Sequence, residues 1–521
     1  MSSSFQLTQL LGFPNLSPNL LLFPISLATF ATVYGVYYGL FHPLHKFPGP
    51  FLAKFCDLWR FRSAATGTSH LKAIELHQKY GPIVRIGPTT LSFAAPSYIP
   101  KIYGPGRGFH KSAFYNPFQG KVQNTIGYNL FTSRDPQFHA SIKQPVAAAY
   151  GRANMIEYEP IVNSCIVKFV QRLIEEFDTK ERVPCDLGSW FQYFAFDAIA
   201  EMTMGQSLGF LDQGIDINNM IHTLDARLDL IAPRSQMPWV DWLFEKNPLV
   251  SLFKPKSSGF FIFASRLVKE RADELKILEK EGRRSGASLF IDRFLEAKKK
   301  YPDTVDDRTV GIYTTSNIMA GSDTIAIVLR TIVYMVLRHP DVQKKLLEEL
   351  DSSELSSPVT WEESQKLPYT AAVVQEALRI HPPVGFGIER DVPPSGLLLD
   401  DGTIIPQGVQ VSMNAWVLHQ DPIFEADPTA FKPERWLKRD DESESDHKER
   451  IAAMERAWLP FGHGSRACMG KHISYLEMNK LVPTMFRELE FELCGGVDKE
   501  WKTRNSWFVR QWDMDCYIKK R

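Results

Sequence analysis

The stretch FGHGSRACMG, residues 461–470, is the most informative part of this 521-residue chain. Its three glycines let the backbone adopt a positive φ or approach a ligand closely, as a tight loop beneath a flat ligand requires. Such a loop aims backbone N–H groups at Cys468. The residues that follow, His472 to Met478, continue as a helix, so the cysteine lies beside a positive helix end. This position favours a thiolate over a thiol.

An isolated cysteine is more often a small buried apolar residue than a ligand. Here the spacing F-x-x-G-x-R-x-C-x-G fixes five positions, and a chance match is on the order of one in a million per position. This loop resembles the haem-binding loop of the cytochrome P450 family. The resemblance implies that Cys468 is the thiolate ligand of a haem b iron, that Arg466 pairs with a haem propionate, and that Phe461 packs beside the sulfur. The physical chemistry agrees, because a guanidinium matches a carboxylate with two hydrogen bonds.

A long helix is predicted for residues 304–338, about nine turns at 3.6 residues each. Its middle, AGSDT at 320–324, places an acid and a hydroxyl where a core helix should be apolar. The glycine weakens the helix by roughly 1 kcal/mol relative to alanine, and Thr324 can bond the carbonyl of Ala320, so we expect a kink with room for water. A solvent-exposed turn is the alternative. The segment resembles the oxygen groove of the family, which implies that Asp323 and Thr324 relay protons and that Ala320 lines the substrate pocket.

A charged cluster is predicted from two separate segments. Glu376 and Arg379 lie three residues apart on a helix, a spacing that is also common on solvated faces. The later segment FKPERW, residues 431–436, contributes Arg435. These segments resemble the E-x-x-R and P-E-R-W elements of the family, which implies a buried cluster of these three residues on the cysteine side of the haem. Its role would be folding and haem retention, because breaking such a cluster costs several kcal/mol.

The substrate pocket is expected from two loops. Residues 104–135 are rich in Gly and aromatic rings, and alone they would suggest a surface loop. In the family the matching segment roofs the haem pocket, so the resemblance implies that Phe114 and Phe118 line it. By the same match Val384 and Phe386, in the run VGFG, line the pocket opposite the sulfur.

A second propionate contact is expected on the helix after this roof. His139 and Lys143 are four residues apart and share one helical face. They resemble the Trp or His followed by Arg that bonds the haem propionates in the family. Lys143 departs from the commoner arginine, because it offers a point charge in place of a planar fork.

The N-terminal 41 residues carry no charged side chain, and residues 20–41 form a 22-residue apolar run that is long enough to span a bilayer. We expect a transmembrane anchor at 20–41 after a short lumenal segment, 1–19. A signal peptide is not expected, because it would carry basic residues before the apolar run and this chain has none there. Basic residues follow the run, so the positive-inside rule places the rest of the chain in the cytoplasm. Residues 42–50 form a proline-rich hinge typical of microsomal members, which implies the endoplasmic reticulum membrane. The sequence leaves open whether Asn15, in a sequon, is glycosylated.

Composition limits the classes of partner that the protein is expected to bind. Lys+Arg and Asp+Glu both number 60, and no basic stripe is visible, so nucleic acid is not an expected partner. The six cysteines show no C-x-x-C pair, which predicts reduced thiols in a chain that faces the cytosol. Among smaller features, residues 237–244 are predicted to be an aromatic part of the core, with a membrane contact or channel lip as the alternative. The run 439–450 is predicted to be a solvated loop, and Pro483 is predicted to kink or end the helix after the cysteine.

Together these motifs predict a mainly α protein with the cytochrome P450 fold, a large helical domain with a small β region, at residues 51–521. The segments FPGPFLA (47–53) and WLPFG (458–462) resemble filamentous-fungal members of the pisatin demethylase-like branch. That resemblance implies a monooxygenase that inserts one oxygen atom of O₂ into an apolar secondary metabolite, by hydroxylation or oxidative O-demethylation. Electrons would come from NADPH through NADPH-cytochrome P450 reductase, with cytochrome b5 as an alternative donor, because the chain shows no flavin or nicotinamide domain.

Two other classes of function stay open. One is a haem-thiolate isomerase or dehydratase that does not use O₂, against which the Asp323-Thr324 pair argues. The other is a haem-binding sensor without catalysis, for which an aromatic roof and an oxygen groove would have no use.

Overall fold

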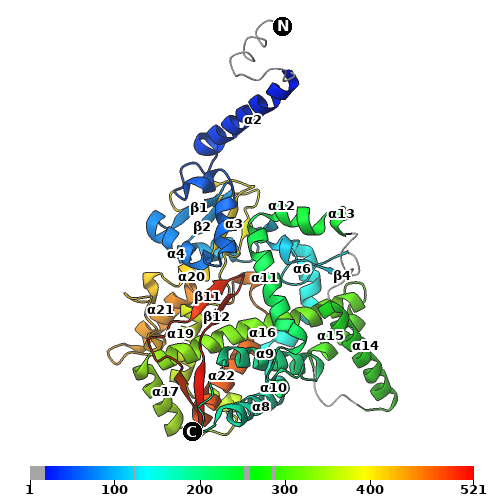
Figure 1. Ribbon diagram of the computed structural model, residues 1–521, viewed down its shortest axis with the longest axis vertical. Helices are drawn as coiled ribbons and strands as arrows, with labels where there is room; N and C mark the ends of the chain where they lie inside the picture. Colours follow the sequence, from blue (N-terminus) through cyan, green and yellow to red (C-terminus); the bar gives the residue numbers. More distant parts are fainter. Residues whose placement is uncertain (1–17, 123–124, 252–258, 284–288) are drawn as a thin grey trace.

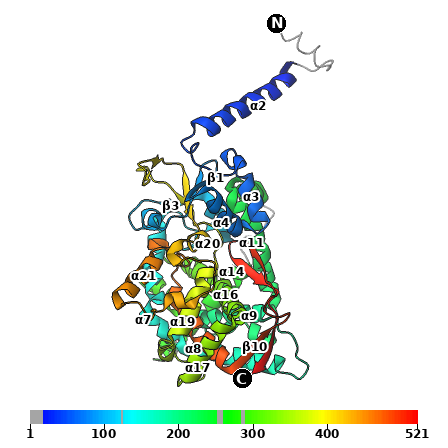
Figure 2. The ribbon, with the colours of Figure 1, turned by 90° about the vertical axis from the view of Figure 1, so that its left-hand side faces the viewer.

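The computed structural model describes residues 18–122, 125–251, 259–283 and 289–521. The predicted lumenal segment, with Asn15, therefore lies almost entirely outside the described residues. The first helix, α2 (Pro18–Val36), projects away from the body of the protein in both views (Figures 1 and 2), and the π-helical turn η1 (Tyr37–Phe41) follows it where the chain meets the body. Large apolar side chains on them, such as Phe30 and Phe41, are exposed. Among the described residues, however, only α16 has both the length and the hydropathy of a membrane span, and α16 is mostly buried.

The hinge is packed onto the body. Leu44 and Phe47 are buried, and the guanidinium of Arg85 donates to the carbonyl oxygens of Tyr38, Leu44 and Lys54 at 3.1–3.3 Å. Arg85 is itself completely buried. One side chain thus satisfies carbonyl groups that a Pro-rich segment cannot pair in a helix or sheet.

A five-stranded sheet lies beside this hinge. Its order is β1 (Ile83–Gly87), β2 (Thr90–Phe93), β9 (Gln410–Met413), β6 (Arg390–Asp391) and β3 (His110–Lys111). Strands β2 and β9 are parallel, and the other neighbours are antiparallel. Four antiparallel pairs complete the β structure: β4 (Gly120–Val122) with β5 (Thr125–Gly127), β7 (Leu397–Leu398) with β8 (Ile404–Ile405), β10 (Leu489–Leu493) with β13 (Cys516–Lys520), and β11 (Lys502–Asn505) with β12 (Val509–Trp512).

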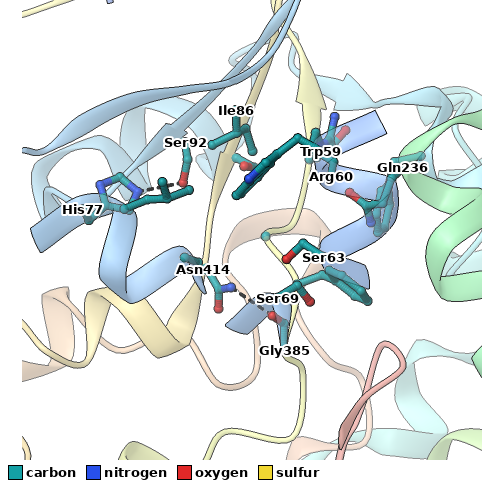
Figure 3. Close-up of a pocket in the computed structure, with 17 residues that line it drawn as sticks. Trp59, Arg60, Ser63, Ser69, His77, Ile86, Ser92, Gln236, Gly385 and Asn414 are labelled. Atoms are coloured by element: carbon teal, nitrogen blue, oxygen red, sulfur yellow. Dashed lines mark hydrogen bonds and ion pairs between the residues drawn. The ribbon is translucent and has the colours of Figure 1, made fainter. Parts of the chain in front are cut away.

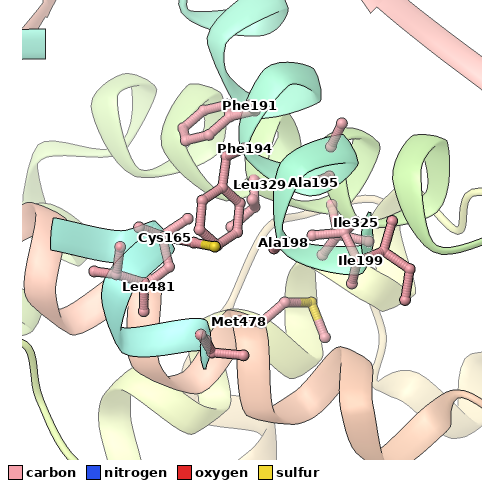
Figure 4. Packing of buried hydrophobic residues seen from close by; sticks show 14 of the residues in the cluster. Cys165, Phe191, Phe194, Ala195, Ala198, Ile199, Ile325, Leu329, Met478 and Leu481 are labelled. Atoms are coloured by element: carbon pink, nitrogen blue, oxygen red, sulfur yellow. The ribbon is translucent and has the colours of Figure 1, made fainter. Parts of the chain in front are cut away.

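The main core surrounds the long helix α16 (Asp307–Arg338), which packs against α9 (Leu187–Met204) and α22 (Lys471–Glu488). Figure 4 shows Phe194 and Ala198 of α9, Leu329 of α16 and Leu481 of α22 meeting beside Cys165 of α8 (Glu159–Phe177). Helix α9 is apolar on nearly all sides, and a helix of this kind is stable only when other elements enclose it.

The remaining helices cover this centre (Figure 1). They are α3 (Leu58–Ala65), α4 (Ser69–Tyr80), α5 (Ile99–Tyr103), α6 (Pro136–Lys143), α7 (Arg152–Met155), α10 (Phe210–Gln213), α11 (Met220–Gln236), α12 (Pro238–Asp241), α13 (Pro248–Ser251), α14 (Gly259–Lys280), α15 (Phe290–Lys300), α17 (Pro340–Ser352), α18 (Trp361–Ser364), α19 (Pro368–Ile380), α20 (Ala415–Leu418) and α21 (Glu444–Arg456).

Three predictions about local structure are wrong. Seven of the twelve residues in the charged run 439–450 belong to α21, because Ser443 caps the helix by accepting from the N–H of Asp446. Pro483 does not end α22, which continues to Glu488, since packing on several sides holds the helix together. The aromatic residues near 240 are not core: Trp239 is 61% exposed and Phe244 is 58% exposed.

Candidate active site

A cavity of about 510 Å³ lies at the centre of the molecule, between α16, α11, α22 and the loops that flank them. Eleven of the residues predicted from the sequence line it: Phe118, His139, Lys143, Ala320, Asp323, Thr324, Val384, Phe386, Phe461, Arg466 and Cys468. They come from segments more than 300 residues apart in the chain. Phe114 lies just outside this cavity, and the Glu376 cluster lies in the protein interior away from it.

The cysteine loop has a conformation that depends on its glycines. Gly462 and Gly464 both have φ of +68°, and a Cβ on Gly464 would lie 2.0 Å from the carbonyl oxygen of Tyr103. The N–H of Cys468 donates to the carbonyl of Phe461 at 2.8 Å and closes the loop. This geometry turns the thiol of Cys468 toward the cavity, and the ring of Phe461 lies beside Tyr475 of α22.

The protonation of Cys468 depends on two opposing effects. Burial raises the pKa of the thiol, while the N–H groups of Gly470 and Lys471 and the charge of Lys471 act in the opposite direction. Burial is the larger of the two effects, and the N–H groups at the helix start act against it in favour of the thiolate. A bound metal cation would supply the missing stabilisation, since a coordinating thiol is deprotonated.

Five basic side chains meet at one end of the cavity. They are Lys111, His139, Lys143, Arg390 and Arg466. The hydrogen bonds among them go mostly to neutral groups: Arg466 donates to the carbonyl of Ser133 at 2.9 Å, and Lys143 donates to that of Ser465 at 2.7 Å. None of the four Lys and Arg side chains has an ion pair with a carboxylate within the described ranges.

The pKa values of these side chains show that keeping the five basic groups together is unfavourable. Burial, together with the charge of Arg390, lowers the pKa of Arg466 to about 10, and burial with the nearby cations lowers that of His139 to about 3. The pKa of Lys111 is also well below its usual value, because of burial and then Arg390. Uncompensated buried cations fit a ligand with two carboxylates, as haem has. Lys111 and Arg390 were not predicted from the sequence as site residues. The only signal for them is that they are charged residues within short apolar strands.

Asp323 and Thr324 lie on the cavity side of α16, and α16 is continuous through both residues. Asp323 is 2% exposed; its Oδ1 accepts from Nε2 of Gln192 at 2.6 Å, and its Oδ2 has no partner in the described structure. Burial, with the negative charge of Asp225 adding to it, raises the pKa of Asp323 to about 7. The hydroxyl of Thr324 donates to the carbonyl of Ala320 at 3.0 Å. Gln192 was missed, although a glutamine within the apolar α9 was a signal.

Gly321 lets α16 approach α9 closely. A Cβ at this position would lie 2.7 Å from the side chain of Ile199, so a larger residue would push the two helices apart. The exposed-turn alternative for residues 320–324 is wrong, because Ser322, Asp323 and Ile325 are all buried.

An aromatic wall closes the cavity on the side of the 113–132 loop. The indole of Trp507 lies 5.2 Å from the rings of Phe118 and Phe131 and 6.3 Å from that of Phe386, all between ring centroids. Trp507 has φ of +95°, which is unusual for a large side chain and is maintained here by this packing. No motif in the sequence indicated that Trp507, near the far end of the chain, would join the roof.

A second pocket of about 60 Å³ lies behind this wall (Figure 3). Phe114 and Phe386 line it on one side, and Phe386 also lines the large cavity. His77 bonds the hydroxyl of Ser92 at 2.8 Å, and the amide of Asn414 donates to the carbonyl of Gly385 at 3.0 Å. The small volume fits a few water molecules better than an organic ligand, and the polar groups in the lining offer them hydrogen-bond partners.

The cluster of Glu376, Arg379 and Arg435 is fully enclosed. Both oxygens of Glu376 accept from Arg379, at 2.7 and 2.9 Å, and Oε1 also accepts from Nε of Arg435 at 2.9 Å. The N–H of Lys432 and the indole of Trp436 complete the hydrogen bonding of this carboxylate. One negative charge thus holds α19 to the η10 turn (Pro433–Trp436).

His419 connects this cluster with the cysteine loop. Its Nδ1 donates to the carbonyl of Arg379 at 2.9 Å, and its Nε2 accepts from the N–H of Leu459 at 3.3 Å. The bond that Nε2 accepts requires a neutral ring, and burial lowers the pKa of His419 to about 3. The ring also stacks on Trp458, so the start of the cysteine loop is tied to α19 by one side chain.

Comparison with known proteins agrees with this geometry. The cytochrome P450 family model matches residues 48–512. Cytochrome P450 monooxygenase cicH of Emericella nidulans is 37% identical over 89% of this chain and 92% of its own length. A cytochrome P450 monooxygenase of Aspergillus terreus is 37% identical over 88% of this chain and 92% of its own, and vrtE of Penicillium aethiopicum is 35% identical over 92% and 91%. The chain therefore belongs to the cytochrome P450 family and is an oxygen-incorporating oxidoreductase, a monooxygenase.

Proposed function

We propose that this protein is a haem-thiolate monooxygenase that hydroxylates or oxidatively O-demethylates an apolar secondary metabolite. The observation that carries the proposal is one cavity in which a cysteine thiol, a cluster of unpaired cations and an acid-hydroxyl pair all face the same space. A haem that lies between the three features would explain why they occur in one cavity. NADPH is the electron source in this proposal, through a membrane-bound reductase.

The residues that would hold the haem are those of the cavity floor and its basic end. Cys468 would be the thiolate ligand, with Phe461 packed beside it. Arg466, His139 and Lys143 would bind the propionates, and the structure adds Lys111 and Arg390 to this group. When bound, haem with a thiolate ligand supplies the activation of O₂, because the thiolate donates electron density to the iron.

Asp323 and Thr324 would deliver protons to the oxygen-binding side of the cavity. A pKa near 7 lets Asp323 accept and release a proton at neutral pH, as a proton carrier must. Thr324 uses its proton in the bond to Ala320, so its oxygen lone pairs are free to accept from water and hold it in the cavity. This pair disfavours an isomerase or dehydratase, which would not need protons at that position.

The substrate would lie against the aromatic wall. Phe118, Trp507 and Phe386 offer flat apolar faces and edges, which suits a substrate with aromatic or other rigid rings. Val384 and Ala320 complete this part of the lining.

Membrane attachment is part of the proposal. Helix α2 with η1 would anchor the protein in the endoplasmic reticulum membrane as a single span, with the catalytic part in the cytoplasm. The exposed residues Trp239, Trp242 and Phe244 support a second contact with the bilayer, because indole and phenyl rings partition into its interface.

A reconstituted assay tests the function. The haem-loaded protein is combined with NADPH-cytochrome P450 reductase, O₂ and extracts of cells that lack the gene, and NADPH consumption and oxygenated products are measured. We expect substrate-dependent NADPH oxidation and a product that contains one atom of ¹⁸O from ¹⁸O₂. A product formed without NADPH or ¹⁸O would support the isomerase alternative, and no product at all would support the sensor.

The variant Thr324→Ala tests the role of α16. We expect unchanged haem binding but less product per NADPH, with the electrons appearing in hydrogen peroxide, because losing a positioned proton relay costs about 10²–10⁴-fold in the dependent step. Asp323→Asn should slow turnover instead. Thr314→Ala is the matched control, since Thr314 makes the same bond to the carbonyl four residues earlier but does not line the cavity. Normal coupling in Thr324→Ala would exclude this residue from the mechanism.

A further inference from the structure

The wall that α11 contributes to the cavity carries one charge among apolar side chains. Leu224, Arg227, Leu228 and Ile231 line the cavity from this helix. Their spacing of three and four residues places them on one face. The guanidinium of Arg227 extends toward Gly120, another cavity residue, where a Cβ would lie 3.5 Å from Nη2. Arg227 therefore occupies the position of an apolar residue in an otherwise aliphatic stripe.

The nearby carboxylates are paired with other cations. Arg234 lies 3.3 Å from Glu245, and Lys246 lies 2.9 Å from Asp241. Lys246 also donates to the carbonyl of Asn116. Arg227 makes no hydrogen bond or ion pair with any part of the chain that the structure describes.

The surroundings of Arg227 show where its free face points. Its side chain retains exposed surface, yet burial lowers its pKa despite the more distant charges of Glu245 and Asp241. Arg227 is an exposed residue that lines the large cavity, so part of its exposed surface faces that cavity. A guanidinium without a partner in such a place is costly, and a bound anion would remove the cost.

This cation is separate from those assigned to the haem propionates. Lys111, His139, Lys143, Arg390 and Arg466 come from β3, α6, β6 and the cysteine loop, and they already outnumber two propionates. Arg227 comes from α11, on the wall that the proposed substrate would contact. Its anion is therefore expected on the substrate and not on the cofactor.

We propose that the substrate of this enzyme carries a carboxylate and that Arg227 binds this group, which makes Arg227 a specificity-determining residue. The inference rests on the proposed monooxygenase function and narrows its substrate class to apolar ring compounds with one acidic end. The planar guanidinium matches a carboxylate with two parallel hydrogen bonds, and a water-poor cavity strengthens them. Binding at α11 would leave the apolar part of the substrate against Phe118 and Trp507, with the far end presented to the Cys468 side.

The test compares an acid with its ester. The haem-loaded full-length protein is titrated with 4-(2-naphthyl)butanoate and with its methyl ester, by calorimetry and by the shift of the Soret band. We expect the wild type to bind the acid about 10- to 100-fold more tightly than the ester, the range for a hydrogen-bonded charge in a buried site. Arg227→Gln should remove this preference by weakening the acid alone, and Arg227→Lys should retain part of it.

Arg234→Gln is the matched control, because Arg234 lies on the same helix but pairs with Glu245 and does not line the cavity. It should preserve the preference for the acid. Equal affinity of the wild type for acid and ester, binding of neither, or equal weakening of both in Arg227→Gln would overturn the proposal. Binding requires no NADPH or reductase, so a protein that selects the acid but forms no product would contradict the monooxygenase function and not the role of Arg227.

Discussion

At the scale of single residues, Cys468 differs from the other cysteines by its surroundings. Cys165, Cys185 and Cys516 are buried, and burial raises the pKa of each thiol. Cys468 is the cysteine whose thiol faces the large cavity and whose loop supplies N–H groups to it. A free thiol is an inert apolar group in the first setting and a metal ligand in the second.

Cys468→Ser should therefore abolish the red-shifted Soret band that a thiolate-ligated, CO-bound ferrous haem shows, since a serine hydroxyl is a far weaker donor than a thiolate. The absorption spectrum of the reduced, CO-treated protein measures this. Cys494→Ser serves as the control, because Cys494 lies near β10 and does not line the cavity. A normal band in the Cys468 variant, or its loss in the Cys494 variant, would show that the ligand has been misassigned.

Asp323 should make stability depend on pH. Its pKa rises from 3.8 to about 7 on folding, so between these values the folded protein holds a proton that the unfolded chain has released. The stabilisation is complete below the lower value and is lost as pH rises to about 7, by about 1.4 kcal/mol for each unit of pH across the window. Asp323→Asn should remove this contribution.

The measurement is the free energy of unfolding at several pH values from 5 to 8 for both proteins. The difference between wild type and Asp323→Asn should change in favour of the variant as pH rises. Asp307→Asn, at the exposed start of the same helix, is the control and should follow the wild type. Parallel curves for wild type and Asp323→Asn would mean that the carboxyl is ionised in the folded protein.

At the scale of elements, the Glu376 cluster connects α19, the η10 turn and the cysteine loop. Glu376 accepts from both arginines, and His419 extends the connection from the carbonyl of Arg379 to the N–H of Leu459. Apart from Leu459 at the start of the cysteine loop, none of these residues lines the cavity. We therefore propose that they act on the cofactor through position, by holding the loop that contains Cys468.

Glu376→Gln should reduce the yield of haem-loaded protein severely, because buried Arg379 would lose its counter-ion and Arg435 would keep only a longer ion pair with Glu425 at 3.7 Å, at a cost of about 3–5 kcal/mol. The ratio of Soret absorbance to total protein after purification measures haem incorporation. Glu434→Gln is the matched control: Glu434 lies on the same η10 turn, but its ion pair with Lys345 is partly exposed and worth about 1 kcal/mol or less. Equal haem content in the two variants would exclude the positioning role.

At the scale of the whole molecule, the apolar surface is unevenly distributed. Phe51, Leu52 and Leu58 beside the hinge, and Trp239, Trp242 and Leu249 after α11, are exposed together with the side chains of α2. In Figure 1 α12 and α13 lie at the upper side of the body, the side from which α2 projects. A membrane that receives α2 would therefore meet these residues as well.

Deletion of residues 1–41 should leave haem binding intact and reduce membrane association without eliminating it. The deletion removes one of the carbonyl groups that Arg85 bonds, that of Tyr38, and leaves those of Leu44 and Lys54. Adding Trp242→Ser and Phe244→Ser should release most of the remaining protein, because two exposed aromatic rings are lost from the interface. Sedimentation with vesicles of neutral phospholipid measures the bound fraction.

Ile277→Ser in the deletion variant is the control, since Ile277 is exposed on α14, which lies at the lower right of Figure 1, away from α2. It should leave the bound fraction unchanged. Complete release by the deletion alone would mean that residues 239–249 do not contact the bilayer. Loss of haem in the deletion variant would show that the anchor and the site depend on each other.

The sequence by itself determined the features that depend on residue type and short spacing. The Cys468 loop, the Asp323-Thr324 pair within a long helix, and the Glu376 and Arg379 pair could all be recognised, because each depends on positions within a few turns or one loop. Glycine at position 464 is an example, since its positive φ and its closeness to the Tyr103 carbonyl admit no other residue. Family membership followed from these local patterns.

Only the tertiary structure decided which distant residues share the cavity and which faces stay exposed. Lys111, Arg390 and Trp507 join the site from segments with no motif of their own, and Gln192 reaches Asp323 across two helices. Arg227 reads as an ordinary surface arginine until α11 is placed against the cavity, and Trp239 reads as core until α12 is placed outside it. The physical reason is that the burial of a side chain and the pairing of its charge both depend on contacts with remote segments. The same arginine or lysine is therefore a costly buried cation in one packing environment and a solvated cation in another.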